Sequence, residues 1–315
     1  MTRPLDRSRN PIQRDPLKHS ISRAPEERRA KSVTVCIACL CNWTYRSNDI
    51  GKAAIIASDR QLIVGDVKYE PPQLKISFLT KQAILLVAGD LALYTEAIHK
   101  LSRKLLSSPE KHPATIAELY AAEMRSINFG YAANQFLSPL GLDKSIFSNQ
   151  QKLPESLILS LASQLQNYRG ASVEAILVGT DGKDVHLYLI DSDTNVSCHN
   201  DVGFVSIGIG AWHANSQLMQ ARFVNKLPFN YTLGLVYAAK KRGEIASSIG
   251  VETDMFIVNR NGWMPVAPEI MKTLTKHYEE YIKEQEKLAS ATLDKLNLDL
   301  QEFEKSILPN RQTSY

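Results

Sequence analysis

The sequence predicts an α+β chain whose main domain is a four-layer αββα sandwich, with an added C-terminal helix. Along its 315 residues, segments of strand and helix pattern follow one another as strands, two helices, strands, two helices and strands. Neither half of this series can bury its apolar faces alone, although 44% of the chain is hydrophobic. Two sheets packed face to face, with a helix pair on each outer face, satisfy that order.

The first strands are expected close to residue 34. Residues 34–41 and 53–58 are rich in β-branched and small apolar side chains, which favours two buried strands. The polar stretch 42–52 between them predicts a hairpin with a long connection. A third buried strand is expected over 83–88, where a Gly-Asp pair closes it.

The middle of the chain has helical patterning. After the third strand, apolar residues recur at helical spacing, at Leu93, Ala97, Leu101 and Leu105. A second helix is expected over about 115–133. The less regular segment 137–169 contains two prolines and one apolar stretch, and we interpret it as an insertion with a short helix.

The second half repeats the alternation of strands and helices. The expected strands are 174–179, 186–190, 203–207, 255–258 and 263–266, with a turn at Asp181-Gly182 between the first two. Two helices are expected before the last two strands, at about 215–224 and 232–247.

A long, highly charged helix is predicted from Pro268 to about Ile307. It carries a partial apolar stripe, formed by Leu288, Leu293, Leu296, Leu300, Phe303 and Ile307. Such a helix is marginally stable alone. We therefore expect it to pack against its own domain or against a neighbouring subunit, with a solvated single helix as the alternative. The chain divides into 1–33, 34–266 and 267–315.

The basic character of the chain belongs to residues 1–33. This segment has nine Lys and Arg against four Asp and Glu, a net charge of +5, whereas the whole chain carries +4. It has four prolines, few large apolar residues and no periodicity, which is typical of a disordered leader. A nucleic-acid-binding arm is the alternative to an inert or removed extension. We favour the removed extension and expect neither nucleic acid nor a membrane as partner.

Cysteine usage and hydropathy indicate a reduced compartment. Cys36, Cys39 and Cys41 crowd into one apolar segment and Cys198 stands apart, which is no disulfide framework. The chain shows neither a membrane-spanning apolar run nor the apolar core of a secretory signal. We expect a cytoplasmic protein without a cofactor or metal.

Four segments together resemble one known family. They are Thr34-Val-Cys-Ile-Ala, Ile55-Ile-Ala-Ser-Asp59-Arg60, Leu74-Lys75-Ile76 and Leu86-Val-Ala-Gly89-Asp90. Their order and the intervals of 16 residues from Asp59 to Lys75 and 14 from Lys75 to Gly89 resemble the proteasome β-subunit superfamily, and its bacterial members most of all. The resemblance covers roughly residues 34–266.

The resemblance implies an N-terminal-nucleophile hydrolase of the threonine type. As a member of such a family the chain would be an endopeptidase subunit that assembles into a ring-forming homo-oligomer and cleaves peptides or unfolded proteins. Whether an ATP-dependent unfoldase feeds such a chamber stays open. Two other functions are also open: a noncatalytic structural subunit, and an amidohydrolase that acts on a non-peptide amide, because a fold alone does not fix the substrate.

The chemistry of Thr34 follows from its hydroxyl. A hydroxyl is a weak nucleophile at neutral pH and needs a base within reach, and an N-terminal threonine carries that base as its own α-amine. A nearby ammonium lowers the pKa of this amine, and Lys75 is the candidate. Asp59 would pair with Lys75 and hold it in place. Gly89 is suited to offer its backbone N–H to the oxyanion of the transition state.

Two positions depart from the family pattern. Where the active members have a serine in a Gly-Ser-Gly turn, this chain has Ile209 between two glycines. The family's distal acid and serine correspond only approximately to Glu244 followed by Ser247 or Ser248, and Ser248 is our candidate for the supporting hydroxyl.

The position of the nucleophile has one alternative. Ser32 can take the terminal position instead of Thr34, because a serine performs the same chemistry, and we prefer Thr34. In either case a free α-amine is required, and with Thr34 as the nucleophile we expect residues 1–33 to be absent from the active protein. Self-cleavage is one route to that end; translation that starts at the codon of Val33 is another.

Overall fold

The computed structural model describes residues 34–46, 49–64, 67–70, 75–107, 111–149 and 153–307. The predicted leader, 1–33, lies outside the described residues, and so does the alternative nucleophile, Ser32. Within the described part, the chain is a mixed α and β protein with two five-stranded antiparallel sheets. The α+β class is therefore confirmed.

The first sheet has the strand order β10-β1-β2-β11-β12. Its strands are β1 (Cys36–Arg46), β2 (Asp49–Asp59), β10 (Phe204–Ile207), β11 (Thr253–Asn259) and β12 (Gly262–Pro265). Strands β1 and β2 are continuously buried over residues 36–41 and 53–59, as expected for strands with packing on both faces. The start of β1 thus lies between β10 and β2.

The second sheet has the order β5-β6-β7-β8-β9. Its strands are β5 (Ile76–Phe78), β6 (Ala83–Gly89), β7 (Val173–Thr180), β8 (Val185–Ile190) and β9 (Val196–Cys198). Gly182, in the predicted turn between β7 and β8, has a φ of +87°. A separate two-stranded ribbon is formed by β3 (Leu62–Val64) and β4 (Val67–Tyr69).

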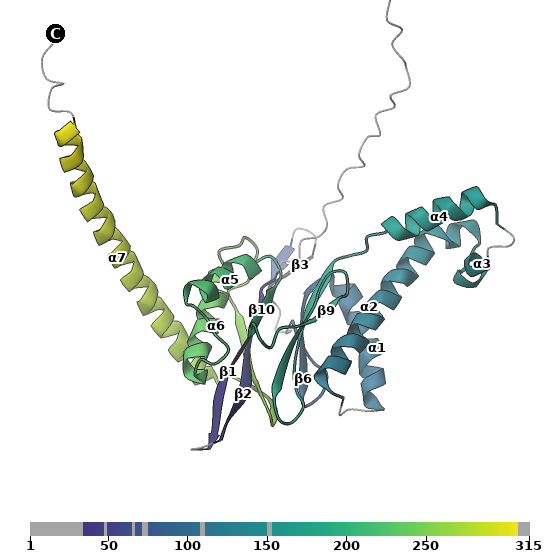
Figure 1. The fold of residues 1–315 in the computed structure, drawn as a ribbon, viewed down its shortest axis with the longest axis horizontal. Helices are drawn as coiled ribbons and strands as arrows, with labels where there is room; N and C mark the ends of the chain where they lie inside the picture. Colours follow the sequence, from purple (N-terminus) through teal and green to yellow (C-terminus); the bar gives the residue numbers. More distant parts are fainter. Residues whose placement is uncertain are drawn as a thin grey trace, which may run out of the picture.

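Three hydrophobic clusters make up the core. One lies between the two sheets, where alternate residues of β1, β2, β6 and β7 meet. The second joins the other face of β6 and β7 to α1 (Leu91–Leu106) and α2 (Pro113–Phe136). The third joins the other face of β1 and β2 to α5 (Ala211–Gln220) and α6 (Phe229–Gly243). Accordingly, Figure 1 shows α5 and α6 on one side of the strands and α1 and α2 on the other.

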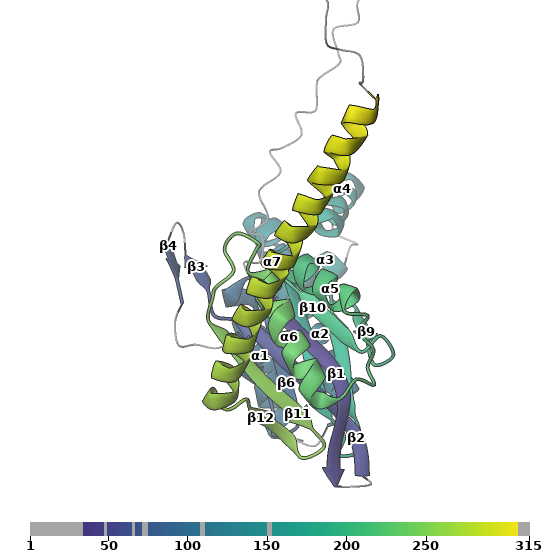
Figure 2. The same ribbon diagram turned by 90° about the vertical axis from the view of Figure 1, so that its left-hand side faces the viewer.

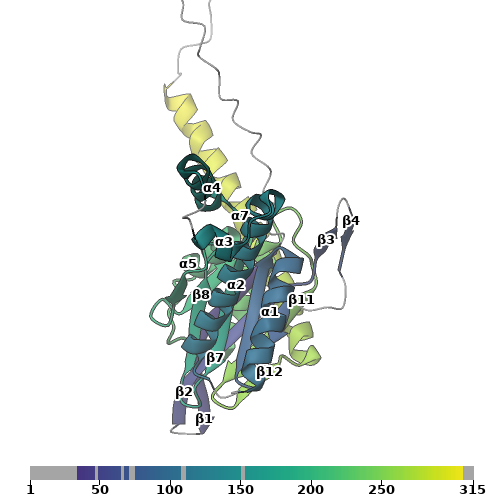
Figure 3. The same ribbon diagram turned by 90° about the vertical axis from the view of Figure 1, so that its right-hand side faces the viewer.

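The remaining helices extend from this body. The insertion after α2 contains η1 (Ser138–Leu140), α3 (Lys144–Ser148) and α4 (Glu155–Asn167). Figure 3 shows α2 and α4 on the face opposite α7. The C-terminal helix α7 (Pro268–Ile307) starts beside α6, as Figure 2 shows, and runs away from the sheets. No helix in the described part of the chain has the length and apolar character needed to cross a membrane.

Most predicted elements are present, and three expectations on their limits are wrong. β1 and β2 are paired as far as Arg46 and Asp49, so the expected long connection is absent. The polar residues there form a ribbon that projects beyond the core, where Lys52 donates a hydrogen bond of 3.2 Å to Asn42. Helix α5 starts at Ala211 rather than 215, and α6 ends at Gly243 rather than 247.

Candidate active site

Thr34 lies immediately before β1, at one end of the layer between the sheets. Its side chain is 5% exposed. Its carbonyl accepts a hydrogen bond of 3.3 Å from the N–H of Gly210, in the turn between β10 and α5. Gly208, in the same turn, has a φ of +86°, and a Cβ on it would lie 2.2 Å from the carbonyl oxygen of Thr34. Only glycine fits against Thr34 at this position.

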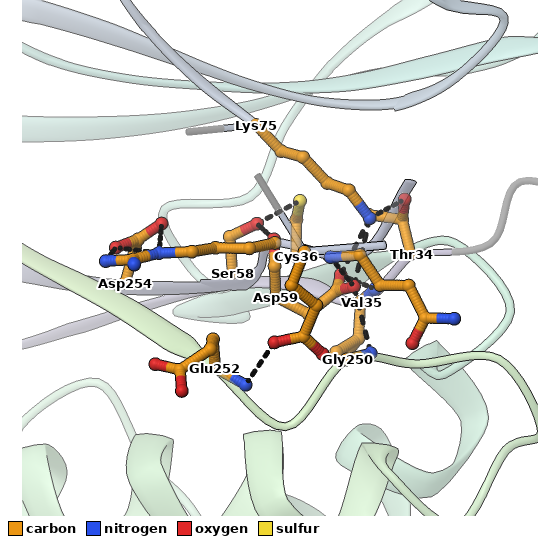
Figure 4. Close-up of polar contacts among 12 residues, drawn as sticks. Thr34, Val35, Cys36, Ser58, Asp59, Lys75, Gly250, Glu252 and Asp254 are labelled. Atoms are coloured by element: carbon orange, nitrogen blue, oxygen red, sulfur yellow. Dashed lines mark hydrogen bonds and ion pairs between the residues drawn. The ribbon is translucent and has the colours of Figure 1, made fainter. Parts of the chain in front are cut away.

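Lys75, Asp59 and Thr34 come together as the sequence predicts. Lys75 Nζ donates a hydrogen bond of 2.8 Å to Thr34 Oγ1 and bonds of 3.1 and 3.0 Å to the two carboxylate oxygens of Asp59. Figure 4 shows the lysine side chain reaching between the other two residues. Lys75 is 5% exposed and Asp59 is fully buried. The hydroxyl of Thr34 thus has a buried, ion-paired cation beside it.

Backbone N–H groups hold Asp59 from three directions. Val35 donates to Oδ1 at 3.0 Å, while Gln61 and Gly250 donate to Oδ2 at 3.1 and 3.2 Å. A carboxylate that accepts several N–H bonds and faces an ammonium is stabilised in its charged form, which offsets its burial. Asp59 therefore fixes Lys75 in place without facing solvent.

Gly89 ends β6 in a conformation that favours glycine. Its φ is +139°, and a Cβ would lie 2.2 Å from the carbonyl oxygen of Ser172. Asp90 then caps α1 by accepting a hydrogen bond of 2.9 Å from Leu93 N–H. Strands β1 and β6 contact each other nearby, because the thiol of Cys36 donates to the carbonyl of Val87 at 3.7 Å. Gly89 and Thr34 are each two residues beyond this contact.

The predicted supporting hydroxyl, Ser248, lies in the loop after α6. Its Oγ accepts a hydrogen bond of 3.0 Å from Lys68, and its φ of +86° is unusual for a residue other than glycine. Glu244 accepts a bond of 2.6 Å from Lys240. Ile209 packs against the cluster beneath α5 and α6, away from the layer between the sheets.

Sequence reasoning missed the residues that hold the loop 248–252. The buried Lys240 donates to the carbonyls of Gly250 and Val251 at 2.9 and 3.1 Å. Glu70 accepts bonds of 2.8 and 3.1 Å from the N–H groups of Val251 and Glu252. The one available signal was Lys240 four residues before Glu244 on a predicted helix, an arrangement that is usually a solvated pair.

A second missed pair stands next to Asp59. Arg60 donates three hydrogen bonds to the carboxylate of Asp254 at the start of β11, at 2.5 to 3.0 Å. This fork-like pair joins the end of β2 to the start of β11.

The cysteines near the site are not nucleophiles. All four cysteines are free, and Cys36, Cys39 and Cys41 are buried. Burial raises the pKa of the Cys36 thiol to about 12, although its hydrogen bond with Ser58 opposes the rise. A thiol with so high a pKa is not ionised at neutral pH and does not compete with Thr34.

One group in the described residues has the composition of a metal site. His112, Asp181 and His186 place their ligand atoms within 4.8 Å of one another. However, Nδ1 of His112 accepts a bond from Ala114 N–H, and Nδ1 of His186 faces the amide nitrogen of Asn200. The Nε2 atoms that face Asp181 therefore carry the protons, whereas a metal needs a nitrogen without one. The group is better explained as a hydrogen-bonded cluster.

Comparison with known proteins adds no name to this site. The chain matches no known protein-family model, and no curated protein is significantly similar to it. The chemistry of this site is therefore inferred from the geometry around Thr34.

Proposed function

We propose that this protein is a threonine-type N-terminal-nucleophile hydrolase with a four-layer αββα sandwich, and that it cleaves peptide bonds. The contact that carries the proposal is the 2.8 Å hydrogen bond from Lys75 Nζ to Thr34 Oγ1, with the same ammonium held by both oxygens of Asp59. A buried threonine hydroxyl has no structural need for a buried lysine. A nucleophile does, because the cation stabilises the negative charge that develops on its oxygen.

The reaction needs the α-amine of Thr34 to be free. The amine takes the proton of Oγ1 while Oγ1 attacks the carbonyl carbon of the scissile amide. Gly89 N–H is the proposed donor to the resulting oxyanion. The ammonium then gives its proton to the leaving nitrogen as the C–N bond breaks, and the acyl group stays on Thr34 as an ester. Water hydrolyses that ester, with the α-amine again acting as base.

A chain that begins at Thr34 tests this mechanism. Intact mass establishes the terminus, and hydrolysis of fluorogenic peptide amides gives the rate. We expect turnover in this chain, none after Thr34→Ala, and little in any chain whose Thr34 nitrogen remains in a peptide bond. Activity that survives Thr34→Ala would eliminate the proposal. If Ser32→Ala alone abolishes the activity of the full-length protein, Ser32 is the nucleophile.

A noncatalytic structural subunit is the second candidate. The packing of Ile209 beneath α5 and α6 favours it, because that turn then offers no hydroxyl to the reaction. A peptide with an electrophilic carbonyl separates the two candidates. A covalent adduct on Thr34, located by mass spectrometry, supports the hydrolase, and the absence of an adduct with a free Thr34 amine supports the structural subunit.

We further propose that the protein is cytoplasmic and assembles from copies of itself through α7. The first part of this helix packs against the domain, where Tyr237 and Thr275 share a hydrogen bond of 2.8 Å. Beyond it, large apolar side chains are at least half exposed, at Leu288, Leu293, Leu296, Leu300 and Phe303. Light scattering on the full chain and on a truncation after Val266 tests this. A monomer in both cases would exclude a ring.

A further inference from the structure

A carboxylate that the sequence did not single out lies on the far side of Thr34 from Lys75. Glu174 is the second residue of β7, paired in register with Ala88 of β6, next to the pair of Gly89 and Val173. Side chains alternate along a strand. Val173 belongs to the cluster beneath α1 and α2, whereas Ile176 belongs to the cluster between the sheets. Glu174 therefore points into the layer between the sheets, at the end where Thr34 lies.

The contact of Glu174 places it beside the turn that touches Thr34. Its Oε2 accepts a hydrogen bond of 3.3 Å from the N–H of Gly208. A Cβ on Gly208 would lie 3.3 Å from the Cβ of Thr34, so this turn lies directly against the threonine. In the first sheet, β10 and β2 with Asp59 lie on opposite sides of β1. In the second sheet, β5, which follows Lys75, and β7, which carries Glu174, lie on opposite sides of β6.

The backbone at Thr34 shows where its nitrogen faces. In an extended chain the N–H and C=O of one residue point to the same side. Val35 shows this, because its N–H donates to the Asp59 carboxylate and its C=O accepts from the Asp59 N–H. The neighbouring C=O of Thr34 points the other way, to Gly210. If the extended conformation of β1 continues to Thr34, the nitrogen of Thr34 lies on the same side as its C=O and faces the turn where the carboxylate of Glu174 is held.

We propose that Glu174 is the positioning residue for the α-amine of Thr34, accepting an N–H bond from it when the amine is protonated. The inference rests on the proposed function, because it requires a free amine. When the amine has taken the proton of Oγ1, one ammonium N–H is directed to Glu174 and another remains for the leaving nitrogen. Lys75 disfavours the ammonium electrostatically, and Glu174 favours it. The two side chains thus bracket the base from opposite sides.

The charged groups around this amine are few. Lys75 carries a positive charge beside Thr34, and the negative charges on the surrounding elements are those of Asp59 on β2, Glu174 on β7 and Asp90 at the start of α1. Burial raises the pKa of both Cys36 on β1 and Tyr94 on α1 to about 12, so both are neutral at the pH of the reaction. Removing the charge of Glu174 should therefore lower the pKa of the amine, by roughly one unit for a partner in hydrogen-bond contact.

The test is the pKa of the Thr34 amine in a chain that begins at Thr34, with Glu174→Gln as the variant. Glutamine keeps an oxygen for Gly208 N–H and removes only the charge. The pH dependence of acylation of the α-amine, followed by mass spectrometry, reports this pKa without any hydrolysis. We expect it to fall in Glu174→Gln and to stay unchanged in Glu118→Gln, an exposed control on α2. The acidic limb of kcat/KM should move to lower pH by the same shift.

Each outcome has a distinct meaning. An amine pKa that is equal in wild type and Glu174→Gln overturns the role of Glu174, even if hydrolysis still depends on Thr34. A shifted pKa in a protein whose hydrolysis survives Thr34→Ala supports the contact and refutes the proposed function. If Glu174→Gln fails to fold, Glu174→Asp replaces it. Its shorter side chain withdraws the carboxylate from the amine, so an unchanged pKa in Glu174→Asp also overturns the proposal.

Discussion

Two lysines of this protein are both buried and paired with a carboxylate, but they differ in their other hydrogen-bond acceptors. Lys75 and Lys240 are 5% and 0% exposed, and each has a carboxylate within 3.1 Å. The partner of Lys75 is the fully buried Asp59, and its third acceptor is the hydroxyl of Thr34. The partner of Lys240 is Glu244, whose side chain is 18% exposed, and its other acceptors are two loop carbonyls.

The type of acceptor distinguishes a lysine that takes part in a reaction from a lysine that only stabilises the fold. Two acceptors of Lys240 are carbonyls of the loop 248–252 and the third is Glu244 at the end of α6, so its bonds hold the loop against the helix. Lys75 donates one hydrogen bond to the hydroxyl of Thr34, the proposed nucleophile. The two are linked, because Gly250 accepts from Lys240 through its carbonyl and donates to Asp59 through its N–H. A disturbance at Lys240 should therefore reach the site mainly through Gly250, with a smaller contribution from the electrostatic interaction of Lys240 with Asp59.

The largest expected effect is on activity at Lys75. Lys75→Met removes the cation beside Thr34 and should lower kcat/KM by on the order of 10³-fold. Asp59 keeps its three N–H donors but loses its buried counter-ion, at a cost of about 3–5 kcal/mol in the free energy of unfolding, so denaturant titration accompanies the kinetics. Lys240→Met should lower kcat/KM by roughly tenfold or less, because it acts through the position of one N–H donor to Asp59. Peptide-amide kinetics on both variants measure the contrast. Equal losses would mean that Lys75 is a structural lysine as well.

The next largest expected effect is a loss of stability in Lys240→Met. Lys240→Met leaves the buried carbonyl of Gly250 without its donor, at a cost of about 2 kcal/mol in the free energy of unfolding. Val251 keeps the bond of 3.2 Å that its carbonyl accepts from Lys241. Denaturant titration measures the loss, and Arg242→Met, at an exposed position of the same helix, is the matched control. A Lys240→Met protein as stable as wild type would show that the loop does not depend on this lysine.

The fold was more accessible to sequence reasoning than the loop around Gly250. Strand and helix patterns depend on local spacing, so α1 was predicted with its four buried residues, Leu93, Ala97, Leu101 and Leu105. The contacts among Thr34, Asp59 and Lys75 were also predicted, from the order and the intervals of the segments that carry these residues.

Other features could not be predicted, for physical reasons. The strands of three residues, β5 and β9 among them, are too short to show a period and owe their pairing to longer neighbours. The side chain of Glu174 looked like an ordinary polar position at a strand end. Its role depends on Gly208, thirty-four residues away in the sequence, and only the packing of two sheets brings them together.

The pH dependence of stability sharpens the comparison further. Burial lowers the pKa of Lys240 from 10.5, although Glu244 opposes the change. Between the lowered folded pKa and 10.5, the unfolded chain binds more protons at this position than the folded chain does. The contribution of Lys240 to the free energy of unfolding therefore rises with pH in that window and is constant below it. The difference in unfolding free energy between wild type and Lys240→Met should accordingly widen as the pH approaches 10.5. A constant difference would exclude a lowered pKa.

The smallest expected effect is at Ser248, in the loop that Lys240 holds. The residue has a φ of +86°, a conformation that costs a side chain about 1 kcal/mol and costs glycine little. Ser248→Gly should therefore raise the free energy of unfolding by about 0.5 kcal/mol, since it also loses an exposed hydrogen bond from Lys68. Ser248→Ala keeps the strained backbone and removes only the hydroxyl, so it should be slightly less stable than wild type. Because Ser248 Oγ accepts a hydrogen bond from Lys68, we expect both variants to keep kcat/KM within about twofold of wild type. A loss of activity in both variants, with stability preserved in denaturant titration, would instead show that the hydroxyl of Ser248 takes part in the reaction. The loop held by Lys240 would then contribute a residue to the active site around Lys75.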